Sequence, residues 1–324
     1  MKPIYSITND NQDITDKFRS NLVSITVTDE MSPQSDSVRI VLSDEKAQIG
    51  VIKVGTVIDV SLGYEHNNGE QSLSRVGRFV IDEVDVSGPP LQVSVVGRST
   101  NFTDHLKSYR TRSFVDTTLA NLVRTIASEN GLVAHISEQF ERINIAHIDQ
   151  TDESDLNFMN RLAKQYDAVL KPVVGDLLLV PHDTSQTVNG SHIAAKVVVG
   201  DQVMKWNVKL PKRSEFGYVK AYWRSDTDGE RQVVIVGDES KAGKTLQTTF
   251  TTQAEAEAAV TGEVNKLQRD IRDLRMTLHG DPELFAERPL NVSGLHPLGD
   301  GTFICKQVTH TLSTSGFVTT VSAS

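Results

Sequence analysis

The chain has 324 residues, of which 38% are hydrophobic and 23% are charged, a composition typical of a folded protein with room for two or three compact domains. Its formal net charge of -9 at pH 7 argues against contact with nucleic acid across the whole surface, so we expect no specific nucleic-acid binding. No apolar run approaches the roughly 18 residues of a transmembrane helix, and the N-terminus MKPIYSITND lacks the apolar core of a signal peptide. We therefore expect synthesis in the cytoplasm and no stable membrane insertion.

Cys305 is the only cysteine, which excludes an intrachain disulfide and a cluster of thiolate metal ligands. It lies in the strand-like run TFICKQV, where a cysteine most often serves as a small buried hydrophobic residue. No histidine or lysine-rich motif that would activate a thiol surrounds it. We interpret Cys305 as a core residue.

Residues 4 to about 107 alternate apolar and polar side chains with a period of two, a pattern that predicts strands separated by turns. Gly88, Pro89 and Pro90 force one of these turns. Five or more strands at this spacing are typical of a β-barrel or a β-sandwich. The clearest strand candidates are residues 22–29, 38–42, 57–62, 78–86 and 91–96.

Residues 108 to about 195 change to a mixed pattern that predicts a small α+β unit. One helix is predicted with Asp116 as its N-cap and with Asn130 and Gly131 at its end. Residues 169–174 and 177–180 flank a Gly-Asp turn and predict a hairpin. The apolar stripe of the helix, at i, i+3, i+4 and i+7, is Leu119, Leu122, Val123 and Ile126.

The clearest amphipathic helix follows the acidic turn HIDQTDESD and ends near Ala168. Asp152 stands at its predicted N-cap position, and Asp155 three residues later is predicted to complete a capping box. Together with Glu153 these carboxylates favour the positive end of the helix dipole. We therefore predict a structural helix cap rather than a catalytic cluster. The apolar stripe is Leu156, Met159, Leu162, Ala163 and Tyr166.

From residue 196 onward the strand pattern returns and one longer helix interrupts it. Residues 219–223 and 232–236 flank an Asp-Gly turn at 228–229 and predict a hairpin. Thr252 and Glu255 form a capping box for a helix predicted over about 253–275. Its apolar stripe is Ala256, Val260, Val264, Leu267, Ile271 and Leu274. The last strand candidates are residues 288–293, 302–309 and 316–322.

Two segments far apart in the chain resemble each other. TVIDVSLG at residue 56, followed by FVIDEV at residue 79, is similar to RPLNVSGL at residue 288, followed by FICKQV at residue 303. A match this short also arises by chance in β-rich sequence. If it marks a true repeat, the chain contains two copies of one β domain.

Sites for chemistry are not indicated. The segment GDESKAGKT at residues 237–245 departs from a P-loop, because its spacing is one residue too long and an acidic residue stands where a glycine should be. His147, Asp149, Asp152 and Glu153 lack a compact metal-ligand spacing. No Gly-x-Ser-x-Gly elbow is present, and no carboxylate pair is singled out for a glycosidase. We expect no catalytic residue, no cofactor and no metal.

Tyr222 and Trp223 lie on a predicted strand with their side chains on opposite faces. The simplest interpretation places one in the core and the other at an edge. Aromatic residues concentrate at interface hot spots, so Trp223 is our candidate for a subunit contact. Trp206 is similar but less well placed.

The segment HIDQTDESDLNFMNRLA resembles the signature of the late control gene D family of contractile-tailed phages. The resemblance runs from about residue 14 to the C-terminus, and members are baseplate hub proteins, similar in architecture to the hub portion of type VI secretion spike proteins. Three further segments are similar to this family in the same order: TVIDVSLGYE with GRFVIDEVDVSGPP (56–90), SFVDTTLANLVRTIA (113–127) and VKAYWRSDTDGERQ (219–232).

The resemblance implies an α+β, mainly β fold, in which two tube-like β-barrel domains, residues 1–107 and 196–324, flank a small α+β domain at 108–195. It implies a structural, non-enzymatic baseplate hub of the virion tail. Three subunits with two tube-like domains each would form a pseudo-sixfold ring, so the implied assembly is a homotrimer that adapts a sixfold tail tube to a threefold spike. The implied partners are the tail spike protein, the tail tube and the baseplate wedge proteins.

Two alternatives stay open at this stage. A tail-associated peptidoglycan hydrolase would be an enzyme of the same particle. The hub of a tail-derived secretion or bacteriocin particle would share the fold but serve another assembly. Because the chain lacks the long β-helical extension of fused hub-spike proteins, we expect a separate spike protein.

Overall fold

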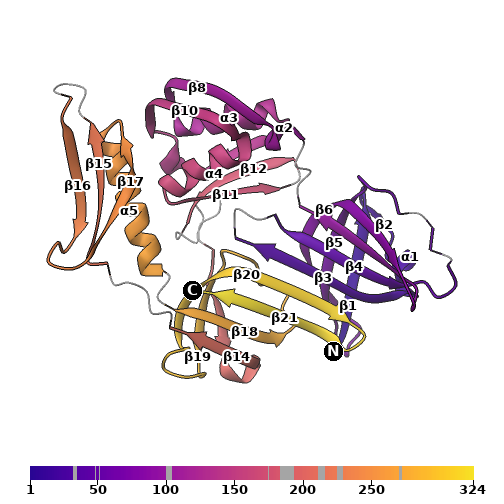
Figure 1. Cartoon of the computed structure of the whole chain (residues 1–324). Helices are drawn as coiled ribbons and strands as arrows, with labels where there is room; N and C mark the ends of the chain where they lie inside the picture. The colour runs from indigo at the N-terminus through magenta and orange to yellow at the C-terminus, as the bar shows by residue number, and fades with distance from the viewer. Residues whose placement is uncertain are drawn as a thin grey trace.

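The computed structural model describes residues 1–31, 35–47, 49–50, 52–99, 104–173, 175–182, 193–210, 216–224, 229–269 and 272–324. The chain is mainly β with a few helices, as the sequence predicts. Figure 1 shows a large sheet region that contains both termini, a magenta α+β unit above it, and an orange unit of strands and a helix at the left. No helix in the described ranges is both long and apolar enough to cross a membrane.

One sheet of thirteen strands organises the chain, and its strands come from both ends of the sequence. The N-terminal part contributes β1 (Lys2–Asn9), β2 (Gln12–Asp13), β3 (Leu22–Glu30), β4 (Ser37–Ser43), β5 (Val57–Glu65), β6 (Gln71–Ser87) and β7 (Gln92–Arg98), with helix α1 (Asp16–Arg19). The C-terminal part contributes β13 (Lys196–Val199), β14 (Val203–Lys209), β18 (Asp273–His279), β19 (Pro289–Ser293), β20 (Gly301–Ser313) and β21 (Gly316–Ala323), with the 3-10 turn η2 (Gly200–Gln202).

The two parts meet where β3 pairs antiparallel with β20, from Glu30 opposite Gln307 to Ser24 opposite Ser313. Strands from residues 1–107 and from residues 196–324, which the sequence suggested as separate β domains, therefore share a single sheet. Figure 1 shows the yellow C-terminal strands continuing directly into the indigo N-terminal ones.

The two halves of this sheet repeat one strand order. The first half runs β3-β4-β7-β6-β5-β1, and the second runs β14-β18-β21-β20 and continues through β19 to β13. Numbered along the chain within each half, these are the same order. One pair differs, because β1 lies antiparallel to β5 whereas β13 lies parallel to β19.

The pairing register of the two halves also agrees. Ile58 of β5 lies opposite Phe79 of β6, and Leu290 of β19 lies opposite Phe303 of β20, with all four side chains in the core. These are the residues of the two similar sequence segments. A β-bulge follows at the same distance in both halves, after Ile81 in β6 and after Cys305 in β20. The resemblance between the two segments is thus also a repeat of topology and register.

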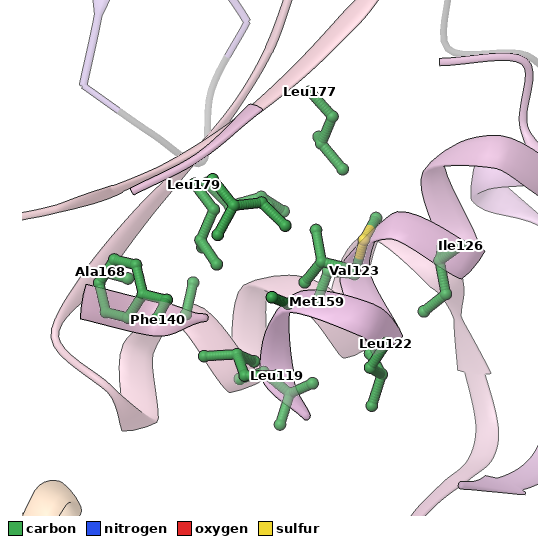
Figure 2. Close-up of a cluster of buried hydrophobic side chains, with 14 of the residues drawn as sticks. Leu119, Leu122, Val123, Ile126, Phe140, Met159, Ala168, Leu177 and Leu179 are labelled. Atoms are coloured by element: carbon green, nitrogen blue, oxygen red, sulfur yellow. The ribbon is translucent and has the colours of Figure 1, made fainter. Parts of the chain in front are cut away.

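Residues 104–181 leave the sheet and form the magenta α+β unit. Its elements are α2 (Asp104–Lys107), β8 (Tyr109–Thr118), α3 (Leu119–Glu129), β9 (Val133–Ile136), the 3-10 turn η1 (Glu138–Phe140), β10 (Asn144–Ser154), α4 (Asp155–Gln165), β11 (Ala168–Val173) and β12 (Asp176–Pro181). The predicted hairpin is confirmed as β11 and β12. Figure 2 shows the apolar faces of α3 and α4 meeting around Val123 and Met159, below Leu177 and Leu179 of β12.

Helix α3 is confirmed, but its predicted N-cap is wrong. Thr118 caps the helix, since its side chain accepts a hydrogen bond from the backbone N–H of Asn121 at 3.2 Å. Asp116 lies within β8 with a φ of 47°, so the strand continues past it. At the other end Asn130 and Gly131 do end the helix, and the φ of +70° at Gly131 is the left-handed conformation that this termination requires.

The orange unit packs helix α5 (Gln253–Arg269) on a three-stranded sheet ordered β16-β15-β17. The strands are β15 (Tyr218–Arg224), β16 (Arg231–Gly237) and β17 (Gly243–Phe250). The predicted hairpin is confirmed as β15 and β16, although Asp228 of its turn lies outside the described residues.

The predicted extent of the long helix is wrong at its C-terminal end. Leu274 belongs to β18 and is buried in the main sheet, while Ile271 lies outside the described residues. At the N-terminal end, Thr252 accepts from the N–H of Glu255, and the Glu255 carboxylate accepts from Thr251. The capping box is therefore shared by Thr251 and Thr252.

Phe79 and Phe303 occupy equivalent places in the two half-sheets, and both are buried. We expect Phe79→Ala and Phe303→Ala each to lower the free energy of unfolding by about 3–5 kcal/mol. The exposed neighbour Thr302, replaced by alanine, should change it by less than about 0.5 kcal/mol. Denaturant unfolding followed by circular dichroism measures all three variants. A large loss in only one phenylalanine variant would contradict the equivalence.

Candidate functional site

The acidic turn before α4 is arranged differently from the prediction. Ser154, not Asp152, is the N-cap, because its hydroxyl accepts from the backbone N–H of Asn157 at 3.3 Å. Strand β10 runs on to Ser154, two residues further than expected. Asp152 has a φ of 45° and lies at a bulge between Gln150 and Glu153. Aspartate tolerates this left-handed conformation better than most residues, which explains its presence there.

Asp155 does not complete a capping box but begins the helix, and its side chain is fully buried. Arg112 on β8 donates to its Oδ1 at 2.8 Å. Gln150 on β10 donates to the same oxygen at 2.8 Å, and Asn130 at the end of α3 donates to Oδ2 at 3.1 Å. Arg110 Nε lies 3.7 Å from Oδ2. One carboxylate therefore connects both helices to both strands of the small sheet.

This network accounts for the acidic stretch structurally. His147 and Asp149 lie on β10 as a half-exposed pair, with Nε2 and Oδ1 3.1 Å apart. Asp149 also accepts from the Ser113 hydroxyl, and these hydrogen bonds lower the pKa of its carboxyl. Across the described ranges, no group of three or more His, Cys, Asp or Glu side chains is arranged to hold a metal ion.

We predict that replacing Asp155 lowers the stability of the protein much more than replacing Asp152. Asp155→Asn should lower the free energy of unfolding by on the order of 3 kcal/mol, because the fully buried carboxylate that pairs with the partly buried guanidinium of Arg112 is lost, leaving Arg112 only its pair with Glu129 among the described residues. Asp152→Asn keeps a side chain suited to the left-handed conformation and should change stability by less than about 0.5 kcal/mol. Thermal unfolding of both variants is the measurement. Equal losses would show that the buried network does not stabilise the unit.

A second buried group of charges lies where the α+β unit meets the main sheet. Lys171 on β11 places its Nζ 2.6 Å from Asp29 Oδ1 on β3 and 3.3 Å from Asp36 Oδ1 just before β4. The other oxygen of Asp29 accepts from the backbone N–H of Ala286 at 3.1 Å. Asp29 itself lies opposite Val308 of β20. The group therefore connects the α+β unit with both halves of the sheet.

The charges in this group are unequal, because three carboxyl groups surround one ammonium. Burial by itself lowers the pKa of Lys171, but the carboxylates of Asp29, Asp36 and Glu287 outweigh burial and raise it. Burial raises the pKa of Asp36 to about 7, with Lys171 opposing and Asp29 adding to the rise. Burial likewise raises the pKa of Glu287. Near neutral pH the ammonium of Lys171 therefore stays charged, and the Asp36 carboxyl takes up a proton as the pH falls through its pKa of about 7.

Stability should depend on pH through Asp36. Its pKa is about 7 in the folded chain against 3.8 for the free side chain, so between these values the folded state binds a proton that the unfolded state releases. The contribution of Asp36 to the free energy of unfolding therefore falls as pH rises through this window. Asp36→Asn cannot ionise, so it should gain stability relative to the native chain between pH 5 and pH 8. Melting temperatures of both proteins across this range test the prediction, and a constant difference would contradict it.

Exposed apolar side chains gather on β14, the strand at the end of the main sheet. Met204 is 57% exposed, Trp206 38% and Leu210, just after the strand, 53%. Trp206 stacks on His296 with the ring centroids 6.2 Å apart. A row of exposed apolar side chains on an edge strand is typical of a surface that binds another chain.

Trp223, the residue chosen from the sequence, lies on β15 and is partly buried against the core beneath α5. As a subunit contact it stays a prediction. The segment at 237–245 leads from β16 into β17, a strand, so the helix that a P-loop requires does not follow it.

The group around Lys171 was not predicted from the sequence. Its members come from β11, β3 and two connecting loops, and Lys171 stands 142 residues from Asp29. The only available signal was the single charge of Lys171 inside an otherwise apolar run, AVLKPV. A lysine at such a position needs a buried counter-charge or a route to solvent.

The family model of the phage tail baseplate hub (GPD) matches residues 54–316. The chain belongs to this family. A probable baseplate hub protein of Escherichia phage 186 is 28% identical over 361 residues, covering 98% of this chain and 92% of that protein. The resemblance found in the sequence is thereby confirmed.

Solved structures share the fold at low identity. The tail protein from Neisseria meningitidis MC58 matches with a TM-score of 0.72 and 12% identity, covering 100% of this chain and 96% of that chain. The c3393 protein of E. coli, a type VI secretion component described as structurally similar to the bacteriophage T4 tail proteins gp27 and gp5, matches with a TM-score of 0.54 and 12% identity. That match covers 94% of this chain and 73% of the other.

Proposed function

We propose that this baseplate hub protein works as a trimeric ring that joins the tail tube to the membrane-piercing spike. The observation that carries the proposal is the duplicated half-sheet, with equal strand order and matching register. Three chains would present six similar sheet units around one axis. One face of such a ring suits a sixfold tube, and the other suits a threefold spike.

The positions of the α+β unit and the α5 unit in the chain also fit a ring of three subunits. The α+β unit lies between the two halves, from β7 to β13, whereas the α5 unit is inserted in the second half, between β14 and β18. The six sheet units would therefore be alike at the tube, while the inserted units would repeat only three times. We propose that this asymmetry is what marks the threefold face.

The role we propose is mechanical rather than enzymatic, and its support is that relatives such as the phage 186 protein are named as hub proteins. The partners we propose are the spike protein, the tail tube and the baseplate wedge proteins, within the virion tail baseplate. The likeness to the c3393 protein, which its description makes a type VI secretion component, favours a second candidate: the hub of a tail-derived secretion particle.

The test is the solution mass of the purified chain, alone and mixed with its candidate spike protein, by light scattering after size exclusion. We expect a species of three times the chain mass of 35.7 kDa in at least one of the two samples. A chain that remains monomeric at high concentration, with and without the spike protein, would overturn the ring.

A further inference from the structure

The pairing of β3 with β20 joins the two halves of the sheet, and the equivalent edges at the other ends of the halves are not paired with each other within the chain. In the second half, the late part of β20 pairs with β21 on one side and with β3 on the other. In the first half, the equivalent late part of β6, residues 83–87, pairs with β7 on one side. Among the residues that the structure describes, no strand pairs with its other side.

The bulges allow residue-by-residue comparison of the four strands. The bulge after Ile81 in β6 matches that after Cys305 in β20, so Val86 corresponds to His310. A second pair of bulges lies in the strands that would complete the comparison. It falls after Leu22 in β3 and after Val203 in β14.

With that second alignment, Val27 of β3 corresponds to Val208 of β14. In the existing junction His310 lies directly opposite Val27. The equivalent pairing would place Val86 opposite Val208.

Residues on β14 and on the late part of β6 are more exposed than their counterparts on β3 and β20, as expected if a neighbouring strand is missing. Ile25 of β3 is completely buried, whereas its counterpart Trp206 on β14 is 38% exposed. His310 of β20 is 2% exposed, whereas its counterpart Val86 on β6 is 61% exposed. The described part of the chain provides β14 with a strand partner on one side only, which is β18. An unpaired edge with apolar side chains is a template for another strand.

We propose that β14 of one chain pairs antiparallel with residues 83–87 of β6 in a second copy of the same chain. The proposal rests on the proposed ring and names the contact that closes it. Each chain would then repeat between subunits the junction that β3 and β20 make within one chain. Such a head-to-tail contact between two different surfaces is the kind that closes into rings.

The side chains of the two edges complement each other on both faces. In the proposed register Val86 meets Val208, and Val84 meets Leu210. On the opposite face Asp85 meets Lys209, an opposite-charge pair directly across the strands. A shift by one residue would turn the apolar side chains of one edge toward the charged face of the other, so the register is specified.

Charge also selects between the two edges and their own copies. Pairing two β14 edges would bring Lys205 and Lys209 of both chains together, and pairing two β6 edges would do the same with Glu83 and Asp85. Like charges across strands are destabilising. The alternation of basic and acidic residues therefore favours the contact between unlike edges.

The test uses engineered cysteines in the full-length chain, where the single natural cysteine, Cys305, is buried. The variant Val86→Cys with Val208→Cys places both thiols directly opposite in the proposed register, at a separation that a disulfide spans. The matched control, Asp85→Cys with Val208→Cys, places them on opposite faces of the sheet. After mild oxidation, we expect the first variant to form reducible covalent dimers and trimers, with at least about tenfold more crosslinked chain than the control.

Single-cysteine variants and a charge exchange complete the design. Val86→Cys alone and Val208→Cys alone should give no covalent dimer, while an equal mixture of the two should give dimers. Asp85→Lys should weaken the assembly, and adding Lys209→Asp to it should restore the assembly. Both side chains are exposed, so these variants are expected to fold.

Each outcome bears on the proposal. A trimer by solution mass without crosslinking of the in-register pair would overturn the strand pairing while leaving the ring in place. Crosslinking of either single-cysteine variant would show like edges meeting and would also overturn it. A chain that is monomeric and uncrosslinked, alone and with the spike protein, would overturn the pairing and the ring together.

Discussion

The antiparallel contact between β3 and β20 is the interaction on which the rest of the structure depends. Even its least separated residue pair, Glu30 and Gln307, is 277 positions apart along the chain. Chain entropy permits such a contact because the cost of closing a loop grows only with the logarithm of its length, by about 0.6 kcal/mol for each doubling. The gain comes from burying Ile25 and Val27 on one strand and Leu312 on the other. Through this contact the two ends of the chain become one sheet, and everything inserted between them is held against it.

The charges around Lys171 lie at that same junction and position the α+β unit. A buried ion pair of this kind adds little net stability, because removing the charges from water costs about as much as their attraction returns. Its consequence is geometric: the ammonium reaches Asp29 and Asp36 only when β11 lies over the end of β3. The Asp155 network does the same inside the unit, where one carboxylate sets the two helices against the strands. Apolar burial stabilises these units, and the buried charges determine how they are oriented.

The duplication of the half-sheet explains why two complementary edges occur at the ends of the sheet. Each copy of the half-sheet has two edges of this kind. The contact between β3 and β20 joins one edge of each copy, so that the equivalent edges, on β14 and on the late part of β6, lie at the two ends. Soluble proteins usually protect such edges with charges or short strands. Here one edge carries lysines and the other carries Glu83 and Asp85, so the charges discourage contact between like edges and leave contact between unlike edges favourable. The trimeric ring that we propose would need this combination.

Periodicity along the chain was enough to predict α3, α4, the β11–β12 and β15–β16 hairpins, and the likeness of the segments around Phe79 and Phe303, since each depends on residues a few positions apart. Reading by local pattern failed where a neighbouring element competed for the same residues. Asp116 and Asp152 have the chemistry of N-caps, but their strands continue to Thr118 and Ser154, and Leu274 fits a helical stripe yet is buried in β18. Local sequence pattern thus predicted most of the elements and the family, and it offered the repeat as one of two interpretations. The shared sheet of the two β regions, the contact of Lys171 with Asp29 and Asp36, and the edges that lack a strand partner among the described residues emerge only in three dimensions, because strand pairing and buried charge depend on distance in space rather than along the chain.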